Sequence, residues 1–248
     1  MGAAADPAGT PAARQDAVPA AGPALPAADA PVQALLFDLD GTLIDSMPLH
    51  EQAWAQWFAQ HGLPFDDPAG FFVATAGRGI LEILADLMPA RSVAERARLG
   101  DEREALYRGM ARERLQLIPG AQALIARGAA LGLPMAVCTA APDANVAVAY
   151  QRFGLDQHLT TTVNPDQGFR GKPHPDLFLE AARRLGVAPA HCVVFEDAPL
   201  GIEAARRAGM RAVAVTSTMP AAAFAHFPNL IRTVSDLTTL QPDALALA

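Results

Sequence analysis

Two aspartates separated by one residue follow the first apolar run of the chain. The run covers residues 32–37 and leads into the letters DLDGT, which contain Asp38 and Asp40. In an extended chain, residues two apart point to the same side, so both carboxylates face one direction. An Asp-x-Asp-Gly sequence after a strand is also a common turn, so this pair alone leaves a catalytic site and a simple turn both open.

Other apolar runs also end in polar residues. Thr139 follows the run 133–138, and Glu196 and Asp197 follow the run 192–195. The segment GKPHPD contains Lys172, the only lysine among 19 basic residues. A compact ammonium ion concentrates one positive charge at a point, whereas an arginine presents a planar fork. Lys172 is therefore a candidate for a site where one cation meets several anionic oxygens.

The charges of these residues predict a metal ion. Asp38, Glu196 and Asp197 carry three negative charges, to which Asp40 adds one more when it is ionised. Lys172 is the one positive residue in these clusters, so converging carboxylates would repel each other strongly. Mg²⁺ is a hard cation that binds through oxygen and uses few protein carboxylates. We expect Mg²⁺ at this site.

Such a site suits an aspartate that attacks phosphorus. A carboxylate and a phosphate repel each other, and Mg²⁺ together with a lysine lowers that barrier. Asp38 is the candidate nucleophile, which would become an aspartyl-phosphate. Asp40 would give a proton to the leaving oxygen and then take one from water. Thr139 would hydrogen-bond the transferred group, and Lys172 would contact carboxylate and phosphate together.

The elements that position these residues follow from the alternation of apolar runs and helical segments. This alternation predicts an α/β fold, a Rossmann-like parallel sheet with helices on both faces. Ligands bind at the carboxyl ends of the strands in such a sheet. The expected strands cover 32–37, 133–138, 159–163, 192–195, 213–215 and 230–234, and the expected helices cover 120–132, 145–153, 175–186 and 201–209.

One long segment interrupts the alternation. Residues 46–117 contain no convincing strand but three helical stretches, which begin near 46, 79 and 93. We therefore expect an all-helical cap domain at 46–117, inserted into a core formed by 32–45 and 118–248. Trp54, Trp57 and Phe58 are expected to form the interior of this cap rather than a ligand site.

Composition excludes several classes of function. The net charge of −7 argues against a nucleic-acid partner. No apolar run is long enough for a membrane span. Cys138 and Cys192 fit no metal or disulfide pattern and are expected to be buried. Residues 1–31 contain 19 Ala or Pro residues and no secretory signal, so we expect a disordered leader. We expect a cytoplasmic monomer.

Four motifs resemble those of the haloacid dehalogenase-like superfamily. They are DLDGTLIDS at 38–46, Thr139 after MAVC, GKPHPD at 171–176 and VVFEDAPLGIEAARRAGM at 193–210, and the resemblance covers about residues 32–217. It implies a Rossmann-like core, a helical cap of the first type, Mg²⁺ and an aspartyl-phosphate. It also implies that Asp38, the backbone carbonyl of Asp40 and Asp197 bind the metal, with Glu196 assisting through water.

Within the superfamily, the chain resembles sugar-phosphate phosphatases and β-phosphoglucomutase. The resemblance implies substrate contacts from His50 and from the cap segment TAGRG, which contains Gly77 and Arg78. Further substrate contacts are expected from Thr139, Ala140 and Lys172, and Asp143 and Asn145 are additional candidates.

The expected function is therefore a Mg²⁺-dependent phosphatase for a small phosphorylated metabolite, a sugar phosphate in particular. A phosphomutase of the β-phosphoglucomutase type is the alternative, and a non-enzymatic binding module is a third hypothesis. The identity of the substrate does not follow from the sequence.

Overall fold

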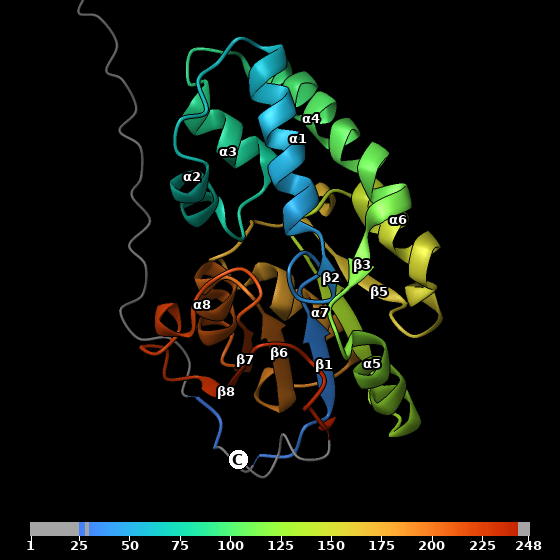
Figure 1. Cartoon of the computed structure of the whole chain (residues 1–248). Helices are drawn as coiled ribbons and strands as arrows, with labels where there is room; N and C mark the ends of the chain where they lie inside the picture. The colour runs from blue at the N-terminus through green and yellow to red at the C-terminus, as the bar shows by residue number, and fades with distance from the viewer. Residues whose placement is uncertain (1–24, 28–29, 243–248) are drawn as a thin grey trace, which may run out of the picture.

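The computed structural model describes residues 25–27 and 30–242 (Figure 1). The leader predicted at 1–31 lies mostly outside the described residues. Among the described helices, none is both long and apolar enough to cross a membrane. Both cysteines are buried and unbonded to each other, as predicted.

A six-stranded parallel sheet forms the centre of the core. Its order is β5-β4-β1-β6-β7-β8, and every neighbouring pair is parallel. Leu35 of β1 lies opposite Met135 on one side and Val193 on the other. The predicted parallel sheet is confirmed, with the strand that precedes Asp38 at its middle. The strands are β1 (Ala34–Phe37), β4 (Met135–Cys138), β5 (Thr161–Val163), β6 (Cys192–Glu196), β7 (Arg211–Val215) and β8 (Leu230–Val234).

Helices cover both faces of this sheet. Leu35 and Phe37 pack into one apolar cluster with α5 and α6, whereas Ala34 and Leu36 pack into a second cluster with α7 and α8. This division follows from the two-residue period of a strand. It explains why the strand sequence is apolar throughout, since both faces are buried. The helices are α5 (Ala121–Ala130), α6 (Asp143–Phe153), α7 (Asp176–Leu185) and α8 (Pro199–Arg207), with short 3-10 turns at Leu155–Gln157, Pro165–Gln167, Pro189–His191 and Ala221–Ala223.

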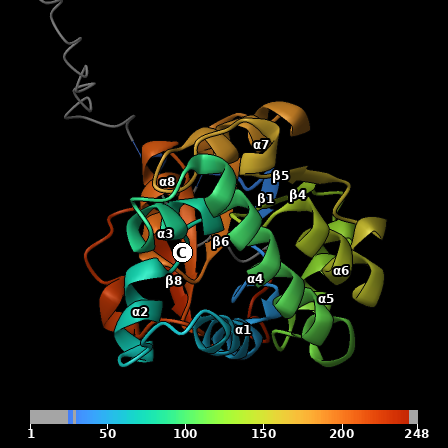
Figure 2. The same ribbon diagram turned by 90° about the horizontal axis from the view of Figure 1, so that it is seen from above.

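Four helices lie over the carboxyl ends of the strands (Figures 1 and 2). Trp54, Trp57 and Phe58 form their interior together with Ile83, Leu84 and Leu99, which agrees with the prediction for Trp57 and Phe58, whereas Trp54 also lines the cavity between these helices and the sheet. The helices are α1 (Met47–Gln60), α2 (Pro68–Thr75), α3 (Ile80–Leu87) and α4 (Val93–Arg114). Helix α2 was not predicted, because its short sequence is apolar on all sides and shows no helical period, although Phe71 and Phe72 pack against this interior.

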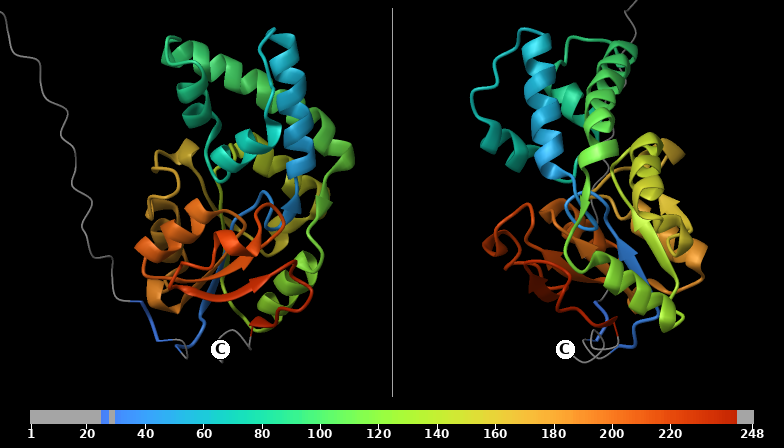
Figure 3. Two further views of the ribbon diagram at one scale, coloured as in Figure 1. Left: turned by 60° about the vertical axis from the view of Figure 1, so that its left-hand side comes forward. Right: turned by 45° about the vertical axis from the view of Figure 1, so that its right-hand side comes forward.

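The two connections between this helical part and the sheet lie side by side (Figure 3). β2 (Ile44–Asp45) pairs with β3 (Gln116–Leu117) in an antiparallel ladder of two residues each. The expectation that 46–117 contains no strand was therefore wrong at its last two residues. The division into a core of 32–45 and 118–248 and a cap of 46–117 stays a prediction.

Candidate active site

Three neighbouring strands bring the predicted polar residues to one edge of the sheet. Asp38 follows β1 and donates its backbone N–H to Phe195 O at 2.9 Å, and Thr139 follows β4 and donates to Val163 O at 3.1 Å. One carboxylate oxygen each from Asp38, Glu196 and Asp197 lies within 4.8 Å of the others. The structure thus brings together residues that are up to 159 positions apart in the sequence.

Lys172 lies beneath this cluster and joins two of its carboxylates. Its Nζ lies 2.5 Å from Asp38 Oδ1 and forms a second ion pair with Glu196. The Lys172 side chain is 1 % exposed. Burial lowers the pKa of Lys172, but the charges of Asp38 and Glu196 outweigh this effect and raise it. Lys172 therefore stays protonated and holds the Asp38 carboxylate in place.

Glu196 is fixed from three sides. Its Oε2 accepts hydrogen bonds from the backbone N–H groups of Asp197 and Ala198, both at 3.1 Å, while Lys172 contacts the other oxygen. The carboxylate rests against Gly201 of α8, where a Cβ atom would lie 1.9 Å from Glu196 Cδ. A glycine is therefore required at this helical position for Glu196 to reach Lys172.

The charges of the cluster fit a divalent cation. Burial raises the pKa of Asp38 well above its usual value, and Lys172 offsets only part of this, while Glu196 and Asp197 add to the rise. Burial and the charge of Glu196 raise the pKa of Asp197 to about 7. Three buried carboxylates against one ammonium ion leave an excess of negative charge, which a bound cation with oxygen ligands would relieve. The donor set therefore fits Mg²⁺.

The loop after β1 passes very close to Asp197. Gly41 has φ of +78°, and a Cβ atom there would lie 2.1 Å from Asp197 Oδ2. Thr42 donates from Oγ1 to Asp197 Oδ1 at 3.4 Å. The glycine in DLDGT thus allows both the sharp turn and the close approach of the two motifs.

A cavity between the sheet edge and the helical cap contains the candidate substrate site. Asp38, Asp40, Thr139 and Asp197 line its core side. The predicted contacts His50, Gly77, Arg78 and Ala140 also line it, as does Asn145. Lys172, Glu196 and Asp143 are not among the lining residues. Lys172 contacts Asp38, which lines the cavity, and its direct contact with substrate stays a prediction.

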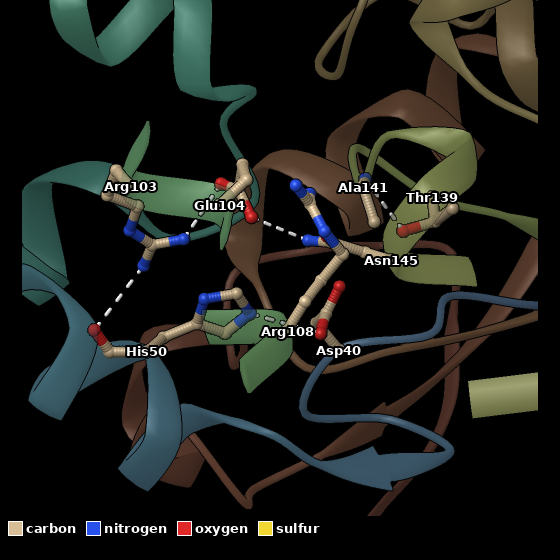
Figure 4. Close-up of polar contacts among 8 residues, drawn as sticks. All are labelled: Asp40, His50, Arg103, Glu104, Arg108, Thr139, Ala141 and Asn145. Atoms are coloured by element: carbon tan, nitrogen blue, oxygen red, sulfur yellow. Dashed lines mark hydrogen bonds and ion pairs between the residues drawn. The ribbon is translucent and has the colours of Figure 1, made fainter. Parts of the chain in front are cut away.

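Asp40 points toward the cap rather than toward the carboxylate cluster. Its Oδ1 lies 3.2 Å from His50 Nε2 (Figure 4). The His50 ring in turn stacks on Tyr107, with ring centroids 4.0 Å apart. Burial raises the pKa of Asp40, but the hydrogen bond and charge of His50, with smaller contributions from Ser46 and Arg103, outweigh it, so the pKa lies below its usual value. Asp40 is thus positioned by the first helix of the cap.

Two charged residues of the cavity were not predicted from the sequence. Arg103 and Glu104 belong to α4, line the cavity and are 3 % and 5 % exposed. They lie within a helix whose sequence contains many arginines and glutamates, most of them exposed. No local pattern distinguishes this pair from the solvent-exposed ones, so only the tertiary structure identifies it.

Comparison with known proteins identifies a family. The family model for haloacid dehalogenase-like hydrolases matches residues 32–209. The chain is 34 % identical over 212 residues to the validoxylamine A 7'-phosphate phosphatase of Streptomyces hygroscopicus subsp. limoneus, which covers 82 % of this chain and 94 % of that protein. It is 35 % identical over 189 residues to a fructose-1-phosphate phosphatase of Escherichia coli (strain K12), which covers 73 % and 95 %.

A solved structure agrees with this result. The crystal structure of a family IA, variant 3 hydrolase from Entamoeba histolytica superposes with a TM-score of 0.78 at 27 % identity, covering 88 % of this chain and 100 % of that one. The family match extends over the residues that form the carboxylate cluster, the lysine and the cap. The chain therefore belongs to the haloacid dehalogenase-like hydrolases, a family of enzymes.

Proposed function

We propose that this enzyme is a Mg²⁺-dependent phosphatase that hydrolyses a sugar phosphate or a similar small metabolite through an aspartyl-phosphate at Asp38. The observation that carries the proposal is the position of Asp38. Asp38 lines the cavity on its core side, and its carboxylate accepts a hydrogen bond from Lys172. The same carboxylate lies in one cluster with that of Asp197. The phosphatase activity of the two relatives supports the same reaction.

In the first step, an oxygen of Asp38 attacks phosphorus and the bond from phosphorus to the leaving oxygen breaks. Asp40 donates a proton to that oxygen, so the product leaves as a neutral alcohol. A bound phosphate favours the protonated form of Asp40, because a nearby negative charge raises the pKa of a carboxyl group. This rise opposes the effect of His50, which lowers the pKa of Asp40.

In the second step, Asp40 takes a proton from water as the water oxygen attacks the phosphorus of the aspartyl-phosphate. The bond between phosphorus and Asp38 breaks, inorganic phosphate leaves and the Asp38 carboxylate is restored. The Thr139 hydroxyl is already an acceptor for Ala141 N at 3.0 Å, which leaves its proton available for a phosphoryl oxygen.

The chain's own residues would hold the metal at the edge of this cavity. Asp38, Asp197 and the backbone carbonyl of Asp40 are the proposed ligands, and Glu196 acts on them through water. Bound Mg²⁺ supplies positive charge that favours ionised Asp38 and stabilises the charge of the transferred group.

The phosphomutase alternative has less support, since both of the named relatives are phosphatases. The monomeric state and the cytoplasmic location stay predictions.

Phosphate release tests the proposal. A panel of sugar monophosphates together with p-nitrophenyl phosphate is incubated with the protein, either with Mg²⁺ or with a chelator. We expect release that requires Mg²⁺ and that falls by at least ~1,000-fold in Asp38→Asn.

The matched control is Asp101→Asn, a neutralised aspartate at an exposed position of α4. This variant should keep the wild-type rate. Equal rates for Asp38→Asn and Asp101→Asn would refute a nucleophilic Asp38.

A further inference from the structure

The wall of the cavity that faces the nucleophile from the cap carries a buried ion pair. Arg103 Nη1 donates to Glu104 Oε1 at 2.8 Å, and both side chains are almost completely buried. The Arg103 guanidinium also donates to His50 O at 3.3 Å and lies 4.6 Å from the centre of the Trp54 ring. Arg103 is therefore held by groups of α1 and α4, and its charge is balanced by its neighbour (Figure 4).

Glu104 connects this wall to the core. Its second oxygen, Oε2, accepts from Asn145 Nδ2 of α6 at 2.6 Å, and Asn145 Oδ1 accepts from Arg108 Nη1 at 3.1 Å. Arg103, Glu104 and Asn145 all line the cavity (Figure 4). They present a guanidinium, a carboxylate and an amide along one wall, which together donate and accept hydrogen bonds but have no net charge.

Stability alone does not explain this wall. A buried ion pair loses solvation on both partners, and apolar residues of similar volume are often at least as stable at such a place. The cap also lines this cavity with five apolar side chains, which are those of Met47, Trp54, Phe72, Ile80 and Ile83. A charged pair in that setting is therefore a candidate for substrate recognition.

The other arginine that lines the cavity is also paired. Arg78 donates to Asp86 Oδ2 at 2.7 Å and to Glu82 O at 3.3 Å. Among the described residues that line the cavity, the arginines are Arg78 and Arg103, and each has a carboxylate partner. A second phosphate or a carboxylate on the substrate would thus meet two arginines that already have carboxylate partners, together with the negative oxygens of Glu104.

We propose that the Arg103–Glu104–Asn145 wall selects monophosphates whose alcohol part is uncharged and carries several hydroxyl groups, and that Glu104 excludes substrates with a second anionic group. A carboxylate accepts from two neighbouring hydroxyls, while guanidinium and amide N–H groups donate to their oxygens. Repulsion by a buried carboxylate of the same sign rejects an acidic competitor. This inference rests on the proposed phosphatase function, and it specifies which class of alcohol the phosphate ester releases.

The test compares kcat/KM for four probes with Mg²⁺ present. Fructose 1-phosphate has an uncharged polyhydroxyl part, fructose 1,6-bisphosphate adds a phosphate, phosphoglycolate adds a carboxylate, and p-nitrophenyl phosphate has neither hydroxyls nor a second anion. For the wild-type protein we expect at least ~10-fold higher kcat/KM with fructose 1-phosphate than with either doubly anionic probe.

Glu104→Gln is the decisive variant, because it keeps the size of the side chain and frees the charge of Arg103. We expect kcat/KM to fall for fructose 1-phosphate and to rise for phosphoglycolate, so that their ratio changes by at least ~10-fold. Glu113→Gln, on an exposed position of the same helix, is the matched control and should keep the wild-type ratio. If Glu104 only connected the cap to the core, Glu104→Gln would change kcat/KM for all four probes by the same factor.

Glu104→Gln leaves Arg103 buried without a carboxylate, so its fold is checked by thermal unfolding. Where that variant does not fold, Arg103→Met combined with Glu104→Gln removes both charges together. This double variant should lose the preference for fructose 1-phosphate over phosphoglycolate.

The possible failures are distinguishable. A wild-type preference for a doubly anionic probe, or an unchanged ratio in the folded variants, overturns this inference and leaves the phosphatase function standing. A preference for the bisphosphate that disappears in Arg78→Ala would place a phosphate subsite at Arg78 and also overturn it. Absence of phosphate release from all four probes overturns the proposed function itself, and the inference with it.

Discussion

At the scale of single residues, the carboxylates under the cavity depend on the space that one glycine provides. Glu196 contacts Lys172, and Lys172 holds the Asp38 oxygen, so a shift of Glu196 is passed on to the proposed nucleophile. Gly201 in α8 is the position at which a side chain would displace Glu196. The glycine therefore affects the active site through two intermediate residues.

Gly201→Ala tests this chain of contacts. The added Cβ atom would overlap the Glu196 carboxylate, so we expect a loss of about 1–3 kcal/mol in the free energy of unfolding and at least ~10-fold lower kcat. Gly109→Ala in α4 is the control, because nothing lies within 4 Å of its Cβ position, and it should gain up to about 1 kcal/mol. A gain of stability in both variants would contradict the assigned role of Gly201.

The raised pKa values of Asp38 and Asp197 predict how the stability of the metal-free protein depends on pH. The unfolded chain loses these protons near pH 4, whereas in the folded chain Asp197 retains its proton up to about pH 7. Above pH 4 the folded state therefore binds more protons than the unfolded state, so stability falls as pH rises from about 4 to 7. Urea unfolding in chelator should show this fall, and Asp197→Asn should reduce it. A rise of wild-type stability over that interval would contradict the pKa assignments.

The sequence predicted the residues under the cavity and some of those above it, but not Arg103 and Glu104. Asp38, Thr139, Glu196 and Asp197 all follow apolar strands, and parallel strands of one sheet bring their carboxyl ends to one edge. Arg103 and Glu104 depend instead on the face that α4 turns toward the core. Their burial is a tertiary property, since α4 also contains many charged residues that are exposed.

At the scale of elements, hydrogen bonds from one arginine of the core connect it to the C-terminal end of α4. Arg152 of α6 donates to three backbone carbonyls at this end: Leu115 O at 2.7 Å, Arg112 O at 2.7 Å and Glu113 O at 2.8 Å. Carbonyls at the end of a helix lack partners within the helix, and a cation there also interacts favourably with the helix dipole. Arg152 thus fixes the point at which the chain passes from the cap to β3.

Arg152→Ala should therefore weaken the connection between cap and core. We expect a loss of about 1–3 kcal/mol in the free energy of unfolding, and faster amide exchange in the last turn of α4. Arg112→Ala removes an exposed arginine of the same helix and should change stability by less than about 0.5 kcal/mol. Equal losses in both variants would show that Arg152 acts as an ordinary surface residue.

Most helices and strands could be predicted from the spacing of apolar residues and from the turn residues that separate the elements. The exceptions have physical reasons. The predicted strand at 230–234 has the same bounds as β8, because polar turn residues precede and follow it in the sequence. Helix α2 packs Phe71 and Phe72 against the cap interior, but its sequence is apolar on all sides and lacks the stripe that identifies a helix. The two-residue strands β2 and β3 are too short for any period, and they form because the two connections lie side by side.

At the scale of the whole molecule, metal binding and folding should be linked. A ligand that binds only the folded state stabilises it, by about 2.7 kcal/mol at a free concentration of 100 times Kd. For a chain of this length we expect Mg²⁺ to raise Tm by about 5–10 °C under those conditions. Asp197→Asn should lose most of this increase. An equal increase in both proteins would place the metal elsewhere.

The cap and the core meet at the cavity, so the proposed chemistry and the proposed selection of substrate lie in different parts of the chain. Asp38, Lys172 and Asp197 belong to the sheet and its loops, whereas Arg103 and Glu104 belong to the cap. Variants of Glu104 should accordingly change which phosphate ester is used, and variants of Asp38 should abolish turnover for every ester.

The most direct test of a nucleophilic Asp38 is mass spectrometry of the protein quenched in acid during turnover with a sugar monophosphate and Mg²⁺. We predict a mass gain of one phosphoryl group on the peptide that contains Asp38, and no such gain in Asp38→Asn or in chelator. Rapid turnover without any phosphorylated Asp38, or a phosphoryl group on another residue, would contradict the proposed mechanism.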